Sequence, residues 1–182
     1  MRRLVLLLLT VSSATLAAQG RHLAPPGAPA RITIADSTEP GSRLIVEGRV
    51  LGPDGGPIPN ASIYAYQTGS DGRYIPGGTG AGGSDRPRLF GYLRSDAEGR
   101  YAFATIKPGS YPGSSNPAHI HFEVSAPNHD DRVYEIVFAD DPYLSDRFRA
   151  QASEPFGGVA IVTARAAAGG PTRVTHDILL RR

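Results

Sequence analysis

The sequence predicts an all-β protein folded as a single-domain β-sandwich, and three observations on its 182 residues lead to this. Its apolar residues stand in short runs, which are separated by turn-forming residues, many of them among the 22 glycines and 16 prolines. The runs recur about every 8–12 residues, which is typical of short strands joined by turns. No long stretch shows the helical period of about 3.6 residues.

The N-terminal residues 1–18 are expected to be a signal peptide and not part of the fold. A basic start is followed by an apolar run over 4–14, and the small residues Thr15 and Ala17 suit cleavage by a signal peptidase. The run is short for a membrane span. We therefore expect export to the periplasm or the cell exterior, with no membrane anchor after cleavage.

Charge and cysteine content narrow the class of protein. The chain has 19 basic and 17 acidic residues, and loss of Arg2 and Arg3 with the signal leaves 17 of each. A net charge near zero gives no electrostatic basis for binding nucleic acid. The chain has no cysteine, so an exported form must be stabilised by its core and not by disulfides.

Residues 19–42 are expected to form an extended arm, since prolines and glycines flank its one short apolar stretch. The sandwich domain is expected over 43–182. Its first strand, 43–51, is rich in apolar residues and ends at the dense turn signal 52–57. Residues 61–67 alternate small or polar with larger apolar side chains, as a half-buried strand does.

The rest of the chain continues this pattern. The Gly- and Pro-rich residues 75–88 are expected to form a surface loop. Asp96–Gly99 supplies a turn between two strands of a hairpin, and 141–151 is the single helical candidate. The remaining strands are expected over 89–95, 100–106, 118–125, 133–139, 157–165 and 173–180.

Two histidines separated by one residue, His119 and His121, are the most informative feature. In a strand, positions i and i+2 face the same side, so both imidazoles should lie on one face. Ile120 and Phe122 would then face the core. Two imidazoles aimed at one point form half of a transition-metal site. The alternative is a strand that presents two hydrogen-bonded histidines to solvent.

Three segments, in this order, resemble the intradiol ring-cleavage dioxygenases, the catechol 1,2- and protocatechuate 3,4-dioxygenase relatives. They are GRVLGPDGGPIPNASIYAYQTGSDGRY, RSDAEGRYAFATIKPGSYPG and PAHIHFEVSAP, and the resemblance covers about residues 40–142. It implies a prealbumin-like (immunoglobulin-like) β-sandwich that holds a mononuclear non-haem Fe(III). By motif, the ligands would be Tyr74, Tyr111, His119 and His121, with Tyr111 and His121 as the axial pair.

The chemistry of ferric iron agrees with that ligand set. A hard, trivalent cation favours anionic oxygen, and a coordinated phenol loses its proton beside a strong cation. Two phenolates and a hydroxide neutralise the ion, and neutral imidazoles complete the shell without adding charge. A partly buried site requires this balance.

The resemblance also implies a function. An exported Fe(III)-dependent enzyme would cleave a catechol-type ring between its two hydroxylated carbons, using O2, to give a muconate-type diacid. Tyr111 would leave the metal carrying one substrate proton, so that it acts as both ligand and base. The partners would be a small catechol and O2, and a homo-oligomer is left open.

Three positions depart from the family pattern. Asn116 replaces an arginine that is thought to stabilise charge on the substrate, and a neutral amide is a weaker donor than a charged group. Tyr66 and Gln67 stand where the family has a Trp-Gln pair. Glu135 stands, after a one-residue gap, at the place of a glutamine near the site. These four residues are expected to contact substrate, with Asn116 also taking part in catalysis.

Two other functions compete with this one. The departure at Asn116 fits a homologue that binds iron but is catalytically impaired. A non-catalytic β-sandwich binding module fits the turn-rich strands, yet has no need of the His-x-His and Pro-Gly-x-Tyr-Pro motifs. The alternative for Tyr74 is an ordinary strand or loop residue with no ligand role. The turn before it (71–74) resembles the turn before Tyr101 (98–101), for which no ligand role is expected.

Overall fold

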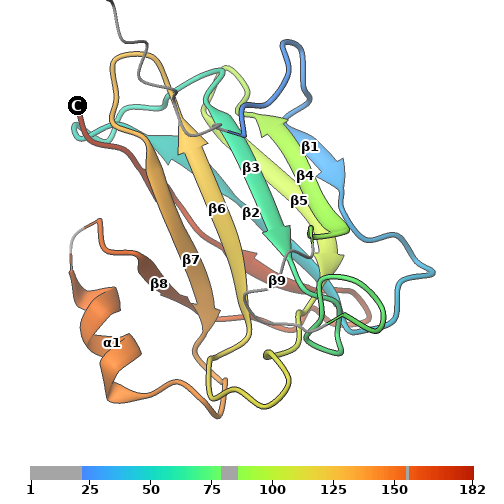
Figure 1. Cartoon of the computed structure of the whole chain (residues 1–182). Coiled ribbons are helices and arrows are strands. Elements are labelled where there is room, and N and C mark those ends of the chain that lie inside the picture. Colours follow the sequence, from blue (N-terminus) through green and yellow to red (C-terminus); the bar gives the residue numbers. More distant parts are fainter. Residues whose placement is uncertain (1–21, 79–85, 155) are drawn as a thin grey trace, which may run out of the picture.

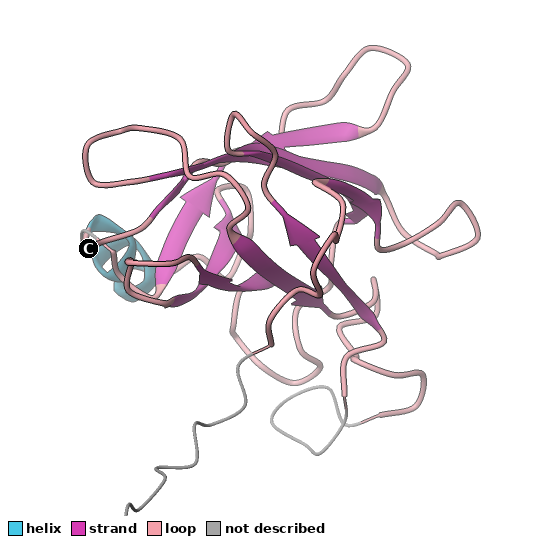
Figure 2. Ribbon diagram, turned by 90° about the horizontal axis from the view of Figure 1, so that it is seen from above, coloured by secondary structure: helices cyan, strands magenta, loops and turns pink. Residues whose placement is uncertain are grey.

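Two five-stranded sheets pack face to face in the structure, a computed structural model, with one short helix at the side (Figures 1 and 2). The structure describes residues 22–78, 86–154 and 156–182. The expected signal peptide, 1–18, lies outside the described residues, as does the centre of the 75–88 loop. The all-β sandwich prediction is confirmed.

The first sheet is built around β2 (Arg43–Leu51). On one side β5 (Arg100–Ile106) runs antiparallel to it, and β1 (Arg31–Thr33) runs parallel to β5 at the edge. On the other side β9 (Thr172–Thr175) and β10 (Ile178–Leu179) both run parallel to β2.

The second sheet has the order β4, β3, β6, β7, β8, and these strands are antiparallel except for the parallel pair β7–β8. Helix α1 lies in the connection from β7 to β8, which is the crossover that a parallel pair needs. Within the described ranges, no helix is long and apolar enough to span a bilayer. The bounds are β3 Ser62–Gln67, β4 Leu89–Arg94, β6 His119–Ser125, β7 Arg132–Phe138, α1 Asp146–Ser153 and β8 Val159–Val162.

The core lies between the two sheets and is made of the inward-facing side chains of both. Val46 and Phe103 from the first sheet meet Ile120 and Phe122 from the second, and all four are fully buried. The burial of Ile120 and Phe122 confirms the predicted alternation along β6, and it leaves His119 and His121 on the outer face of the sheet.

The arm differs from expectation because part of it is a strand. Residues 31–33 form β1, whose Ile32 occupies the space that a side chain at Gly91 of β4 would fill. Further toward the N-terminus, the His22 ring stacks on Tyr64 at 4.5 Å. The arm therefore joins the edge of the first sheet to the outer face of the second.

The C-terminal strand and the helix also differ from the predicted ranges. The strand expected over 173–180 is divided at His176–Asp177, since His176 O accepts a hydrogen bond from the Tyr101 hydroxyl at 2.7 Å and Asp177 accepts one from the Arg49 backbone. The helix begins at Asp146 rather than 141. Asp141 forms a turn instead, in which one carboxylate oxygen accepts a bond from the Ala118 backbone N–H at 2.9 Å.

Candidate metal centre

The candidate site lies on the outer face of the second sheet, where three neighbouring strands place polar side chains in register. His121 of β6 stands opposite Tyr66 of β3 on one side and Glu135 of β7 on the other. Paired residues in adjacent strands share a face, so these three side chains lie together with His119. The two imidazole centroids are 4.6 Å apart with their planes at 90°.

Two loops bring tyrosines to the same place. Tyr74 lies in the loop after β3 and Tyr111 in the loop after β5. Their hydroxyl oxygens are 2.6 Å apart, and each lies near His121 Nε2, at 3.3 Å for Tyr74 and 3.5 Å for Tyr111. The structure therefore gathers Tyr74, Tyr111, His119 and His121, the four residues expected to hold a metal, into one cluster.

The loops that carry the tyrosines are bound to each other through glycines. Gly109 donates its backbone N–H to Gly69 O at 2.9 Å. Gly72 has a φ of +77°, and a Cβ there would overlap the Ser110 carbonyl. Only glycine allows this conformation and this close approach without strain. The short Asp-Gly turn therefore serves to place Tyr74 beside Tyr111.

A hydrogen-bond chain orders the donor atoms. His119 Nδ1 donates to Pro117 O at 2.7 Å, which makes His119 Nε2 an acceptor. The Tyr111 hydroxyl donates to that nitrogen at 3.0 Å, and the Tyr74 hydroxyl in turn donates to the Tyr111 oxygen. The Nε2 atoms of both histidines and both phenol oxygens thus lie together around one point.

Burial keeps these donors uncharged. Removal from water raises the pKa of Tyr74, and its bond to Tyr111 raises it further. Burial raises the pKa of Tyr111 as well. Burial and the neighbouring His119 lower the pKa of His121 to about 3, so its imidazole is neutral with a free lone pair. A cation among these four donors would displace two phenolic protons and supply the positive charge that phenolates need.

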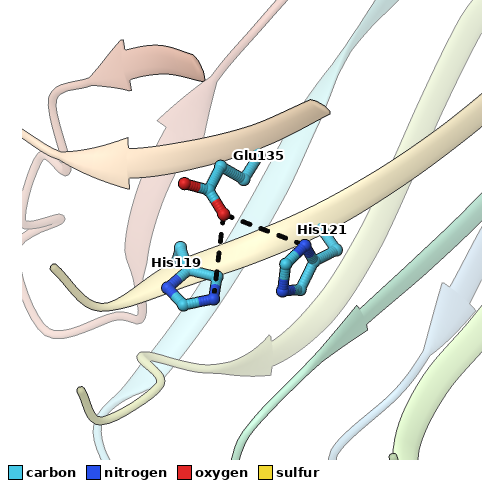
Figure 3. Close-up of side chains that lie close together, drawn as sticks. All are labelled: His119, His121 and Glu135. Carbon is cyan, nitrogen blue, oxygen red and sulfur yellow. Dashed lines mark ion pairs between the residues drawn. The ribbon is translucent and has the colours of Figure 1, made fainter. Parts of the chain in front are cut away.

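Glu135 approaches the same cluster from β7. Its Oε2 atom lies 3.8 Å from His119 Nε2 and 3.9 Å from His121 Nδ1, and Figure 3 shows this one oxygen facing both rings. Each of the three side chains offers a ligand atom, and these atoms lie within 4.8 Å of one another. Glu135 was expected to contact substrate, and the structure places its carboxylate against two metal-ligand candidates.

The structure separates the other expected substrate contacts. The Tyr66 ring stacks on His121 with centroids 4.4 Å apart and planes at 13°. Gln67 is 1% exposed and points inward, where its amide donates to Ile106 O at 3.0 Å and accepts from the Thr105 hydroxyl. Adjacent residues of a strand face opposite sides, so Tyr66 and Gln67 cannot both reach this cluster.

Asn116 and Glu135 line a cavity of about 410 Å³ beside the cluster. The residues that form the other wall of this cavity were not predicted from the sequence. No local pattern could have identified them, because helix α1 reaches this place only through packing against β8. The additional lining residues are Arg147, Phe148, Gln151, Glu154, Gly158 and Val159.

Comparison with known proteins agrees with this geometry. A family model described as Dioxygenase matches residues 21–182. The protocatechuate 3,4-dioxygenase beta chain of Burkholderia cepacia is 37% identical over 58% of this chain and 48% of its own length. Catechol 1,2-dioxygenase 2 of Acinetobacter lwoffii is 33% identical over 62% of this chain and 46% of its own length. The chain belongs to the intradiol ring-cleavage dioxygenase family.

Solved structures of the family share the fold. The dioxygenase domain of a dioxygenase and carbohydrate-binding fusion protein from Streptomyces sp. SirexAA-E matches 86% of this chain and 91% of its own length, with a TM-score of 0.64 and 27% identity. Catechol 1,2-dioxygenase from Pseudomonas arvilla C-1 matches 90% of this chain and 60% of its own length, with a TM-score of 0.66 and 25% identity. The chain spans about half the length of the curated family members named above.

Proposed function

We propose that this chain is an exported, Fe(III)-dependent intradiol dioxygenase that cleaves a catechol-type ring with O2 to a muconate-type diacid. The observation that carries the proposal is the convergence of two tyrosine hydroxyls and two histidine Nε2 atoms, whose neighbouring members lie 2.6–3.5 Å apart. The family membership supplies the reaction class.

The donor set suits ferric iron better than a divalent ion. Phenolate oxygens are hard, anionic ligands, and two of them offset most of a trivalent charge, while neutral imidazoles complete the set. Bound here, ferric iron would supply the Lewis acidity that activates a chelated catechol toward O2. The proposed ligands are Tyr74, Tyr111, His119 and His121.

The residues around these ligands have separate tasks in the proposal. Tyr111 exchanges hydrogen bonds with both Tyr74 and His119, so its oxygen can hold a proton taken from the substrate. Tyr66 holds the His121 ring by stacking. The cavity beside Asn116 and Glu135 would receive the ring and its substituents.

The proposal of export rests on the N-terminal sequence, 1–18, with cleavage before the domain. Fractionation of cells that express the whole chain measures it directly. Recovery of a shortened protein outside the cytoplasm is expected, and a full-length protein retained in the cytoplasm would contradict it.

The proposed activity is tested with purified protein loaded with Fe(III). We expect a broad visible phenolate-to-iron charge-transfer band that shifts when catechol is added without O2, followed by a muconate-type product when O2 is admitted. A shifted band without product would favour an iron-binding but impaired homologue, in line with Asn116 in place of arginine. A colourless protein that binds no iron would leave the non-catalytic β-sandwich module as the better account.

A further inference from the structure

Within the described residues, the ion pairs of the Glu135 carboxylate are made with imidazoles and not with lysine or arginine. Its side chain is 22% exposed, and its ion-pair partners among the described residues are His119 and His121. An imidazole that binds a metal must be neutral, because the metal takes the lone pair that a proton would occupy. If both histidines are ligands, neither can balance this carboxylate.

The position of Glu135 is set by rigid structure and not by a loop. It lies in the middle of β7, in register with His121 of β6, and both neighbours of Glu135 are held in the same ladder. Its Oε2 atom is 3.8 Å from His119 Nε2, the same nitrogen that accepts the hydrogen bond of Tyr111. The carboxylate therefore lies near the His119 nitrogen that is proposed to bind the metal, while its contact with His121 is to Nδ1 (Figure 3).

Charge balance gives this carboxylate a role. Two phenolates leave one positive charge on a trivalent ion, and a carboxylate ligand would neutralise it in place of the hydroxide expected from the sequence. A carboxylate is a hard anionic oxygen ligand of the kind such an ion prefers. We propose that Glu135 is a fifth protein ligand of the metal centre, so that the chain itself supplies three anionic oxygens and two imidazoles.

The inference rests on the metal centre proposed above and competes with a simpler role. Glu135 also faces His121 Nδ1, at 3.9 Å, a distance too long for a direct hydrogen bond. A carboxylate at this place could merely orient the ring of a ligand histidine. The two roles differ in charge, because an amide oxygen can accept a hydrogen bond from Nδ1 but cannot replace an anionic ligand.

Glu135→Gln separates these roles, and Glu123→Gln is the matched control. Glu123 lies on the same face of β6 and loses the same charge, yet its carboxylate pairs with His22 at 3.0 Å and not with the cluster. The three proteins, wild type and both variants, are loaded with Fe(III). The charge-transfer band is recorded, and iron affinity is measured by competition with a chelator, with circular dichroism as the check on folding.

We expect Glu135→Gln to move the band to longer wavelength, because iron with one anionic ligand fewer accepts phenolate charge more readily. Iron affinity should fall about tenfold or more, the size seen when groups supporting a metal site are removed. Glu123→Gln should match the wild type in both measurements. Equal spectra and affinities for wild type and Glu135→Gln would overturn the inference and leave the proposed function standing, whereas a wild-type protein without a band would overturn both.

Discussion

His119 and His121 are each oriented by a contact that does not involve Nε2. Nδ1 of His119 donates to Pro117 O, so Nε2 is the atom that faces Tyr111. The ring of His121 is held by the stacked ring of Tyr66. Side chains oriented in this way lose little freedom when they bind a ligand, and their geometry is precise.

Tyr74→Phe tests the tyrosine that is carried by the loop after β3. The change removes a donor oxygen that lies 2.6 Å from Tyr111 while keeping the ring. Loss of one phenolate should weaken Fe(III) binding about tenfold or more and shift the visible band, with the far-ultraviolet spectrum unchanged. Tyr92→Phe, on a ring that stacks on Tyr64 away from the cluster, is the control. An unaltered coloured centre in Tyr74→Phe would remove that residue from the ligand set.

Asn116→Arg tests the departure in the cavity wall. A guanidinium is a charged donor, and charged hydrogen bonds are roughly twice as strong as neutral ones. If the charged donor stabilises the transition state by about 1.4 kcal/mol more than the amide does, kcat/KM for simple catechols should rise about tenfold. Asn116→Gln adds length without charge and should show no such gain. Iron-loaded Asn116→Arg with the kcat/KM of the wild type would mean that this position does not limit the reaction.

The elements that decide the geometry of the cluster are the two loops after β3 and β5. Neither tyrosine is held by the sheet, and their approach depends on the contact between Gly72 and the Ser110 carbonyl and on the bond from Gly109 to Gly69. The histidines belong to a rigid strand. The cluster therefore joins two fixed donors to two donors whose position depends on loop packing.

Gly72→Ala should separate the loops and damage the metal centre. A Cβ at this position meets backbone atoms of Ser110, so the loops must move apart. Gly55→Ala is the matched control, because Gly55 has the same φ of +77° with nothing within 4 Å of the added Cβ. Both variants should lose about 1 kcal/mol of stability from the left-handed backbone. Iron binding should weaken only in Gly72→Ala, and equal binding by the two variants would contradict this account.

A half-buried histidine helps to hold the two sheets together. His176, between β9 and β10, has its Nε2 atom 2.9 Å from the Tyr134 hydroxyl of β7. Its carbonyl accepts the bond from Tyr101 of β5. Burial, aided by the charge of Arg132, lowers the pKa of His176 to about 4 and so keeps the ring neutral.

This pKa predicts a loss of stability in mild acid. The unfolded chain takes up the proton near the ordinary pKa of about 6.5, while folded His176 resists protonation down to about 4. Stability is therefore full above about pH 6.5 and falls as the pH is lowered toward 4, by about 3 kcal/mol in total. The lowered pKa of His121 likewise makes the folded protein less stable as the pH falls.

Denaturant unfolding of the metal-free protein between pH 4 and pH 8 measures the effect. His176→Gln keeps a hydrogen-bonding side chain but does not titrate, so its stability should vary less over this range than that of the wild type. At pH 8 His176 is neutral in both the folded and the unfolded protein. The difference in free energy of unfolding between wild type and variant at this pH is therefore the effect of the substitution apart from protonation. Parallel curves for the two proteins would show that His176 is not responsible.

The strands that were predicted best are those defined by local pattern and by turns. The strands expected over 43–51 and 100–106 agree with β2 and β5, because alternation and Gly-rich turns are properties of the segment itself. β1 and the break at His176–Asp177 were missed. Both depend on a partner strand or a hydrogen bond from a distant residue, which no local pattern records.

The all-β class and the common face of His119 and His121 follow from the sequence alone, because alternation along a strand is a local property. Which tyrosine of two similar turns joins the histidines depends on the tertiary structure. Tyr74 reaches the cluster, whereas Tyr101 enters the core and bonds His176 O. The tertiary structure also decides that Glu135 lies against both histidines and Gln67 does not, because convergence depends on strand pairing and loop packing.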